Sequence, residues 1–376
     1  MKFLISGGGT GGHIFPAVSI ANALREADPN CDILFVGALG RMEMERVPQA
    51  GYPIVGLPVR GFNRQQPWKN VSVLVDLVRS MWRARRIVRD FRPDVGIGVG
   101  GYASGAAMKV AAKMGVPILL QEQNGFAGVT NKLLKDDAKK ICVAYPGMER
   151  FFPQEKIILT GNPVRQNLSS GNREEAIKYF NEEFGVNFSA DKKTLLIIGG
   201  SLGARTINES IIAYLPQLLQ SDIQVIWQTG KNYFADCDAA LKENNSTFNI
   251  QHSNIIATAF LSNMPLAYAL ADLVISRAGA SSISELCLLG KPSILVPSPN
   301  VAEDHQTHNA MALVSKQAAV LVKDKDAKEQ LIPQALSLIE DDKQLSVLHE
   351  NILTLALPDS ARLIAEEVMK LAQQGK

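Results

Sequence analysis

The sequence predicts an α/β protein with two doubly wound parallel sheets, each in its own domain. The chain has 376 residues, which is too long for one ordinary compact core. Short apolar runs alternate with longer segments of helical periodicity, which is typical of parallel sheets with crossover helices. The order strand, glycine loop and helix start occurs twice, at residues 3–13 and 195–205. This repetition predicts two Rossmann-like domains that face a cleft.

The expected strands fall into two series. In the first half of the chain they are residues 3–6, 33–36, 54–57, 95–99, 118–121 and 141–143. In the second half they are residues 195–198, 225–228, 255–257, 273–276 and 294–296. We expect the domain boundary near Thr160-Gly161-Asn162-Pro163, because the polar stretch that follows at 169–173 indicates a loop. From its residues alone, the last helix, at 360–373, could pack on either domain.

The composition excludes several classes of protein. A hydrophobic fraction of 46% with 20% charged residues is normal for a folded soluble protein, and the net charge of +2 gives no general attraction to nucleic acid. The four cysteines are scattered without a CxxC pair, which argues against structural zinc and fits a reducing cytoplasm. We find neither a signal peptide nor an apolar run of membrane-spanning length.

Two glycine loops are candidates for anion binding. Residues 7–13, GGGTGGH, follow a strand and open a helix, where unpaired N–H groups can bind a phosphate. Gly7, Gly9 and Gly12 match the dinucleotide fingerprint, but the second strand ends in Gly37-Ala38 without the acid that binds a ribose. The sequence therefore argues against an NAD-dependent dehydrogenase. The alternative to anion binding is that the glycines only form a tight turn. Residues 199–204, GGSLGA, lack the Lys-Ser/Thr of an ATP-binding P-loop.

A third strand-to-helix segment lies at residues 276–285 and ends in Glu285. Ser282 and Glu285 have the spacing of a capping box, which would give the acid a structural role. The alternative is that Glu285 accepts hydrogen bonds from ribose hydroxyls while the small residues before it admit a diphosphate. The spacing alone leaves both interpretations open.

Histidines supply the candidate base. His13 lies where the first glycine loop becomes a helix, and the positive end of the helix dipole favours the neutral ring that a general base requires. His305 and His308 lie in EDHQTHN at 303–309. No third ligand is identifiable beside them, so contacts with a ligand are expected there rather than a metal site.

The segment 67–93 predicts an amphipathic helix with two sets of residues on different faces. The set expected in the core is Leu74, Leu77, Val78, Met81, Ala84, Ile87, Val88 and Phe91. The set expected to lie on an anionic membrane surface is Trp68, Val71, Val75, Arg79, Trp82 and Arg86. The alternative for the second set is a solvated basic helix with one exposed aromatic ring.

Seven segments in order resemble one family over nearly the whole chain. They are GGGTGGHIFPA (7–17), GGYASG (100–105), QEQNGFAGVTN (121–131), GNPVR (161–165), GGSLGARTIN (199–208), RAGASSISE (277–285) and EDHQTHNA (303–310). The family is the bacterial undecaprenyldiphospho-muramoylpentapeptide N-acetylglucosaminyltransferases. The resemblance implies a GT-B fold and an inverting transfer from UDP-N-acetylglucosamine to lipid I, which gives lipid II in peptidoglycan synthesis. It also implies that residues 1–163, with the helix at about 359–376, form the acceptor and membrane-associated domain, and that residues 164–358 bind the donor.

The resemblance implies a set of donor contacts and two candidates for the base. The donor contacts are Thr10, Gly11, Gly12, Asn124, Arg165, Ser201, Leu261, Ala280, Ser281, Ser282, Ile283, Ser284, Glu285 and Gln306. Leu261 would contact uracil through its backbone. His13 is the candidate base, with Glu122 in reserve, and no metal or other cofactor is expected. The enzyme would lie peripherally on the cytoplasmic face of the inner membrane.

Three other functions stay open at this point. A different GT-B glycolipid transferase or a UDP-sugar epimerase could share the fold and the nucleotide loops. A non-catalytic UDP-sugar sensor would bind the donor without turnover. The segments GGYASG and QEQNG favour the cell-wall enzyme, because specificity for the acceptor should reside in the first domain.

Overall fold

The structure is a computed structural model that describes residues 1–9, 11–60, 70–164, 168, 171–200, 202–250 and 253–374, apart from the side chains of residues 70–72 and of Ala302. The candidate residues Thr10, Trp68, Arg165 and Ser201, and the side chain of Val71, lie outside this description. The chain divides into two compact units, residues 1–165 with 357–376 and residues 166–356.

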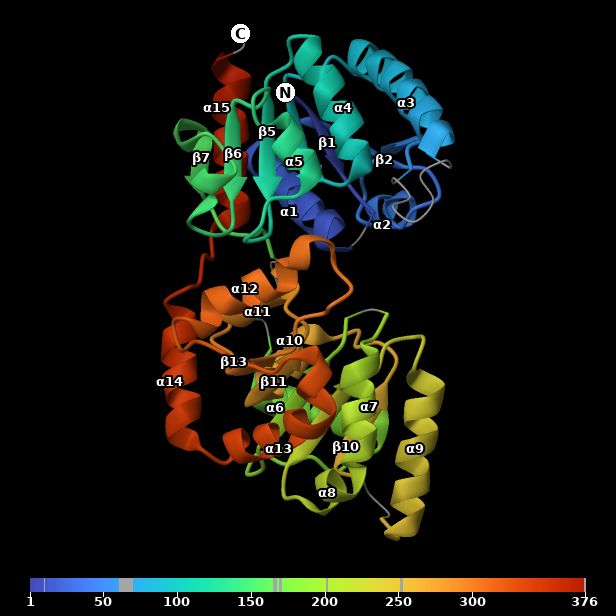
Figure 1. Cartoon of the computed structure of the whole chain (residues 1–376), viewed down its shortest axis with the longest axis vertical. Coiled ribbons are helices and arrows are strands. Elements are labelled where there is room, and N and C mark those ends of the chain that lie inside the picture. Colours follow the sequence, from blue (N-terminus) through green and yellow to red (C-terminus); the bar gives the residue numbers. More distant parts are fainter. Residues whose placement is uncertain are drawn as a thin grey trace. The chain divides into compact units, whose positions relative to one another are not determined.

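The first unit contains a parallel sheet of strand order β3-β2-β1-β4-β5-β6-β7, of which Figure 1 labels β1, β2, β5, β6 and β7. Its strands are β1 (Lys2–Gly7), β2 (Asp32–Ala38), β3 (Ile54–Leu57), β4 (Val95–Gly100), β5 (Ile118–Glu122), β6 (Lys140–Val143) and β7 (Ile157–Leu159). Its helices are α1 (Gly11–Ala27), α2 (Glu43–Gln49), α3 (Asn70–Phe91), α4 (Tyr102–Lys113), α5 (Val129–Leu134) and α15 (Ser360–Gln374).

The second unit repeats this topology in the order β10-β9-β8-β11-β12-β13. Its strands are β8 (Thr194–Ile198), β9 (Gln224–Gln228), β10 (Ile255–Thr258), β11 (Leu273–Ser276), β12 (Ser293–Leu295) and β13 (Val320–Leu321). Its helices are α6 (Arg173–Phe184), α7 (Arg205–Ala213), α8 (Leu215–Gln220), α9 (Phe234–Thr247), α10 (Met264–Leu270), α11 (Ala280–Leu288), α12 (His305–Val314), α13 (Ala327–Ile339) and α14 (Asp342–Leu353).

The predicted class of two doubly wound parallel sheets is confirmed. In both units the first strand lies in the middle and the chain then crosses to the other half of the sheet, which is the Rossmann order. The apolar runs form buried strands because both faces of each sheet are covered by helices. Asp32 begins β2, so the strand ends without an acid, as the sequence indicated.

The helix α15 belongs to the core of the first unit, although it comes last in the chain. Its Ile364, Ala365 and Val368 are buried in one apolar cluster with Ile14 and Ile20 of α1. In Figure 1 the red helix α15 lies beside the first sheet, in the upper part of the view.

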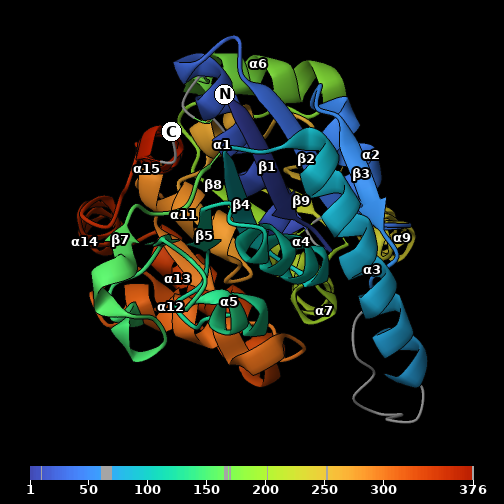
Figure 2. The same cartoon turned by 90° about the horizontal axis from the view of Figure 1, so that it is seen from above.

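The buried face of helix α3 agrees with the prediction except at two positions. Leu74 and Val78, expected in the core, are 53% and 56% exposed. Ala84 and Val88 are buried as predicted, and the other four members of the set, Leu77, Met81, Ile87 and Phe91, are partly buried against the same core. Leu74 and Val78 lie at the edge of this face, so helical spacing alone could not show that they point outward. Figure 2 shows α3 beside α4 at the side of the first unit.

Candidate active site

Two loops meet at the carboxyl edge of the first sheet, where His13 lies. The N–H group of Gly8, which follows β1, donates to the carbonyl of Gly100 at the end of β4, at 3.3 Å. His13 is in the first turn of α1, two residues after Gly11 at the helix start, and its Nδ1 lies 3.0 Å from the carbonyl oxygen of Gly8. The carbonyl can only accept, so Nδ1 carries the proton and Nε2 is the basic nitrogen of the neutral ring.

Glu43 of α2 also contacts this loop, and sequence reasoning missed it. Its carboxylate is fully buried and accepts hydrogen bonds from the N–H groups of Gly9 and Ala38, at 2.9 and 3.0 Å. An acid in the first turn of a helix is normally explained by the helix dipole, so the sequence carries no signal for this contact.

Glu122, at the end of β5, is enclosed by the loop that follows it. One carboxylate oxygen accepts from the N–H of Gly128 at 3.0 Å and from the side chain of Asn131 at 2.9 Å. The other accepts from the backbone and side-chain amides of Asn124 at 3.2 and 3.4 Å. Burial raises the pKa of the Glu122 carboxyl, while these hydrogen bonds act to lower it.

A buried amide network ties this loop to the GNP segment. The side chain of Gln121 donates to Asn162 at 2.9 Å, and Asn162 donates to the carbonyl of Gln123 at 2.9 Å. The side chain of Gln123 donates to the carbonyl of Val99 at 2.7 Å, at the end of β4. The QEQNG and GNP segments are therefore held together at one edge of the first sheet by buried hydrogen bonds.

In the second unit, Gln228 joins the second glycine loop to Leu261. Its side-chain amide donates to the carbonyl of Gly200 at 3.2 Å, and its oxygen accepts the N–H of Leu261 at 3.0 Å. A backbone contact between Leu261 and a base would then use the Leu261 carbonyl. The loop itself packs tightly, because a Cβ on Gly203 would lie 2.2 Å from the carbonyl oxygen of Thr229.

The capping-box interpretation of Ser282 and Glu285 is wrong. The helix α11 begins at Ala280 with Gly279 as its N-cap, so Ser282 lies inside the first turn. Glu285 is buried and accepts a hydrogen bond from the hydroxyl of Tyr268 at 2.9 Å. Ser284 donates to the carbonyl of Ala280 at 3.0 Å.

Gln306, in the first turn of α12, holds the loop before it. Its side-chain oxygen accepts the N–H of Ser298 at 2.9 Å. His305 and His308 belong to the same turn. Across the described part of the chain, no group of three or more His, Cys, Asp or Glu residues is placed to hold a metal ion.

The sequence matches the glycosyltransferase family 28 N-terminal domain over residues 3–143 and the family's C-terminal domain over residues 194–364. The chain belongs to glycosyltransferase family 28. Each domain description falls within one of the two units, apart from the C-terminal end of the second match, which runs into α15.

This glycosyltransferase has close relatives along its whole length. A Bacteroides fragilis protein named UDP-N-acetylglucosamine--N-acetylmuramyl-(pentapeptide) pyrophosphoryl-undecaprenol N-acetylglucosamine transferase is 62% identical over 379 residues, covering 100% of this chain and 97% of the relative. Proteins of the same name from Porphyromonas gingivalis and Flavobacterium psychrophilum are 53% and 50% identical, covering 100% of this chain and 97% and 99% of their own lengths.

Solved structures agree with the fold. MurG of Acinetobacter baumannii superposes with a TM-score of 0.76 and 26% identity, covering 98% of this chain and 99% of its own. A UDP-GlcNAc 2-epimerase from Neisseria meningitidis, bound to UDP-GlcNAc, gives a TM-score of 0.68 over 98% of this chain and 100% of its own. At 16% identity the epimerase supports the fold alone. The predicted GT-B fold of this glycosyltransferase is confirmed.

Proposed function

We propose that this chain transfers N-acetylglucosamine from UDP-N-acetylglucosamine to the C4 hydroxyl of the muramoyl sugar of undecaprenyl-diphosphate-linked muramoyl-pentapeptide. The product is lipid II of peptidoglycan synthesis. The observation that carries the proposal is the 62% identity, over the full chain, to a transferase whose name states this donor and acceptor.

In the proposed reaction the acceptor hydroxyl oxygen attacks the anomeric carbon on the side opposite the diphosphate. A new C–O bond forms, the bond from that carbon to the diphosphate oxygen breaks, and the configuration inverts. UDP leaves with the electron pair, and the hydroxyl proton passes to Nε2 of His13. The hydrogen bond from Nδ1 to Gly8 supports this role, because it makes Nε2 the basic nitrogen.

Glu122 is the weaker candidate for the base because its carboxylate is only 2% exposed and already accepts hydrogen bonds at both oxygens. A base must reach the proton that it removes. Glu122 instead holds the loop from Asn124 to Gly128, and so places Asn124, a proposed donor contact.

The donor binds to the second unit. Glu285 accepts the ribose hydroxyls, and the Leu261 carbonyl contacts uracil. The first turn of α11, from Ala280 to Ile283, lies at the positive end of the helix dipole and stabilises the diphosphate as negative charge grows on the leaving UDP. Ser284 and Gln306 are further proposed contacts in the second unit, and Gly11 and Gly12 are proposed contacts from the first. Thr10, Arg165 and Ser201, which lie outside the described residues, are assigned from the motifs alone.

The helix α3 binds the anionic surface of the cytoplasmic membrane. Val75 and Trp82 are 47% and 76% exposed on a helix whose arginines include Arg79 and Arg86, and Leu74 and Val78 add to the exposed apolar surface. A groove of about 1010 Å³ lies beside them, lined by Trp82, Arg79 and Arg86 of α3 and by Leu34 and Val55 of the sheet. No helix in the described ranges is long and apolar enough to cross a bilayer.

Transfer of radiolabelled N-acetylglucosamine to a short-chain lipid I analogue tests the proposal. Wild type should form the product, and His13→Ala should lose transfer while still binding UDP and keeping its melting temperature. A wild type that binds the UDP-sugar without transfer, beside an active control enzyme, would contradict the proposed function. Incubation with UDP-N-acetylglucosamine alone distinguishes a transferase from an epimerase, because an epimerase would convert the sugar into its epimer without any acceptor.

A further inference from the structure

Glu43 joins the first glycine loop to the end of β2. It is fully buried at the start of α2, where one carboxylate oxygen accepts the N–H of Gly9 and the other accepts the N–H of Ala38. The contact leaves no room for a side chain at position 8, because a Cβ on Gly8 would lie 2.1 Å from Oε1 of Glu43. The carboxylate therefore fixes the position of this turn and requires glycine at position 8.

The bond to Gly9 also connects Glu43 to His13. The N–H of Gly9 and the carbonyl of Gly8 belong to one planar peptide group, so fixing one end fixes the other. Glu43 accepts from the N–H end at 2.9 Å, and the carbonyl end accepts from Nδ1 of His13 at 3.0 Å. Two hydrogen bonds thus connect the Glu43 carboxylate, the Gly8–Gly9 peptide group and the His13 imidazole in that order.

This order has two physical consequences. A carboxylate at the N–H end polarises the peptide and makes the Gly8 carbonyl a stronger acceptor, since hydrogen bonds in a chain reinforce one another. A stronger acceptor at Nδ1 holds the ring in one orientation and keeps its proton on Nδ1. In hydrolases with a Ser-His-Asp triad, a carboxylate does the same by direct contact with the histidine.

We infer that Glu43 is a positioning residue that sets the orientation and tautomer of His13 through the Gly8–Gly9 peptide group. The importance of this for catalysis rests on the proposed function, in which Nε2 of His13 accepts the proton. A carboxylate that only stabilised the fold would move neither the tautomer of His13 nor kcat in a folded variant.

Activity measurements provide the first test. Glu43→Gln keeps the size of the side chain but presents an NH2 group to one of the two N–H donors. We expect kcat to fall about tenfold to a hundredfold, by analogy with the groups that orient metal-binding histidines, with an unchanged KM for the UDP-sugar. Glu45→Gln, which removes an exposed charge from the same helix, is the matched control. A kcat for Glu43→Gln equal to that of Glu45→Gln would overturn the inference.

The second test does not depend on turnover. In protein labelled with 15N-histidine, the ring signals of His13 are assigned by their loss in His13→Ala. Wild type should show His13 protonated on Nδ1, and Glu43→Gln should show a mixture of tautomers. An unchanged tautomer in Glu43→Gln would overturn the inference even if kcat fell. A wild type without transferase activity would refute the proposed function and leave the tautomer result to decide the role of Glu43.

Rescue by a small carboxylate distinguishes loss of the Glu43 carboxylate from misfolding of the variant. Glu43→Ala opens a space in which the N–H groups of Gly9 and Ala38 can bind formate. Formate should restore part of the lost kcat and the Nδ1 proton of His13, whereas chloride at equal ionic strength should restore neither. Equal effects of the two salts would contradict the inference.

Discussion

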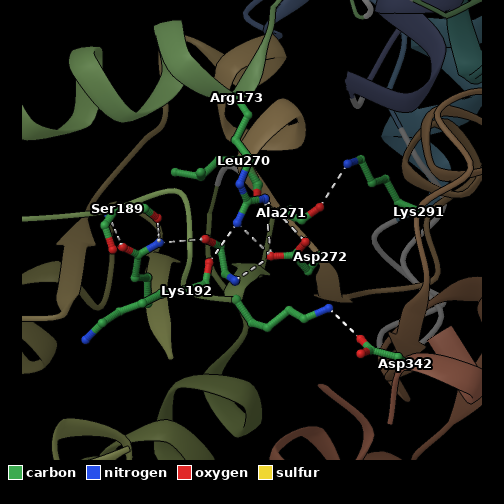
Figure 3. Close-up of polar contacts among 11 residues, drawn as sticks. Arg173, Ser189, Lys192, Leu270, Ala271, Asp272, Lys291 and Asp342 are labelled. Carbon is green, nitrogen blue, oxygen red and sulfur yellow. Dashed lines mark hydrogen bonds and ion pairs between the residues drawn. The ribbon is translucent and has the colours of Figure 1, made fainter. Parts of the chain in front are cut away.

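Arg173 and Asp272, 99 residues apart in the sequence, form an ion pair at the amino-terminal edge of the second sheet, with N–O distances of 3.3 Å (Figure 3). Arg173 also donates to the carbonyls of Leu270 and Lys192, at 3.0 and 2.7 Å. Asp272 accepts the N–H of Thr194 at 2.7 Å, where β8 begins. The ion pair therefore joins the first residues of the neighbouring strands β8 and β11 to the start of α6.

We expect Asp272→Asn to lower the free energy of unfolding by about 2 kcal/mol, because it weakens several charge-assisted hydrogen bonds in a half-buried place. Asp342→Asn is the control. Its ion pair with Lys193 is short, at 2.6 Å, but Asp342 is 79% exposed, so the loss should stay below about 1 kcal/mol. Urea unfolding of both variants gives the comparison, and equal losses would contradict the role given to Asp272.

The membrane surface of α3 gives a second prediction. Val75→Glu with Trp82→Glu should release the protein from vesicles of anionic lipid, because two exposed apolar groups are replaced by charges that the vesicle repels. Val347→Glu, at a residue 40% exposed on α14, is the control and should leave binding unchanged. Co-sedimentation measures both, and retention of the double variant on the vesicles would refute the assignment.

The strands could be predicted from the sequence because buried parallel strands are continuous apolar runs. The runs at 54–57 and 273–276 match β3 and β11 residue for residue. The strands that the sequence missed are β7 (Ile157–Leu159) and β13 (Val320–Leu321), which end their sheets. Two or three residues are too few to show a period, and a short edge strand pairs on one side only.

The candidate site was less accessible to sequence reasoning because its contacts cross between elements. The spacing of Ser282 and Glu285 suggested a cap, but the helix begins earlier, at Ala280, and Tyr268 binds the acid instead. Glu43 could not be found, because its partners lie in a loop 34 residues earlier and at the end of β2. The spacing of residues in the sequence predicts contacts within one helix or strand. The contacts of Glu285 and Glu43 instead depend on how the fold brings separate elements together.

Glu285→Gln gives a prediction for the donor site. If Glu285 binds the ribose, loss of its charge should raise the KM for UDP-N-acetylglucosamine about tenfold or more, since a hydrogen bond to a charged group contributes about 1.5–3 kcal/mol. Steady-state kinetics at saturating acceptor measure this, with Glu350→Gln on the exposed side of α14 as control. An unchanged KM would contradict the proposed contact between Glu285 and the ribose.

The cysteines should be unreactive in the native protein. All four, Cys31, Cys142, Cys237 and Cys287, are free and buried. Burial raises the pKa of the Cys142, Cys237 and Cys287 thiols to about 12, so almost no thiolate forms at pH 8. A disulfide reagent at pH 8 should react slowly with native protein and label all four thiols in guanidinium. Rapid labelling of a native thiol would show that its unit opens easily.

Glu122 predicts a pH dependence of stability. Burial raises the pKa of its carboxyl above the unfolded value, so between these two pKa values the native state binds more protons than the unfolded state. The contribution of Glu122 is therefore most favourable below the unfolded pKa and declines as pH rises through the raised one. Glu122→Gln removes this titration, so wild type should lose stability relative to the variant between pH 4 and pH 7.

Denaturant unfolding at pH 4 and pH 7 measures how the free energy of unfolding changes with pH. The proteins compared are wild type, Glu122→Gln and Glu155→Gln, an exposed control. The control should follow wild type. If wild type instead gained stability over Glu122→Gln with rising pH, the hydrogen bonds from Gly128, Asn131 and Asn124 would outweigh the cost of burying the charge. Glu122 would then be ionised throughout, and its carboxylate would serve to hold the loop from Asn124 to Gly128.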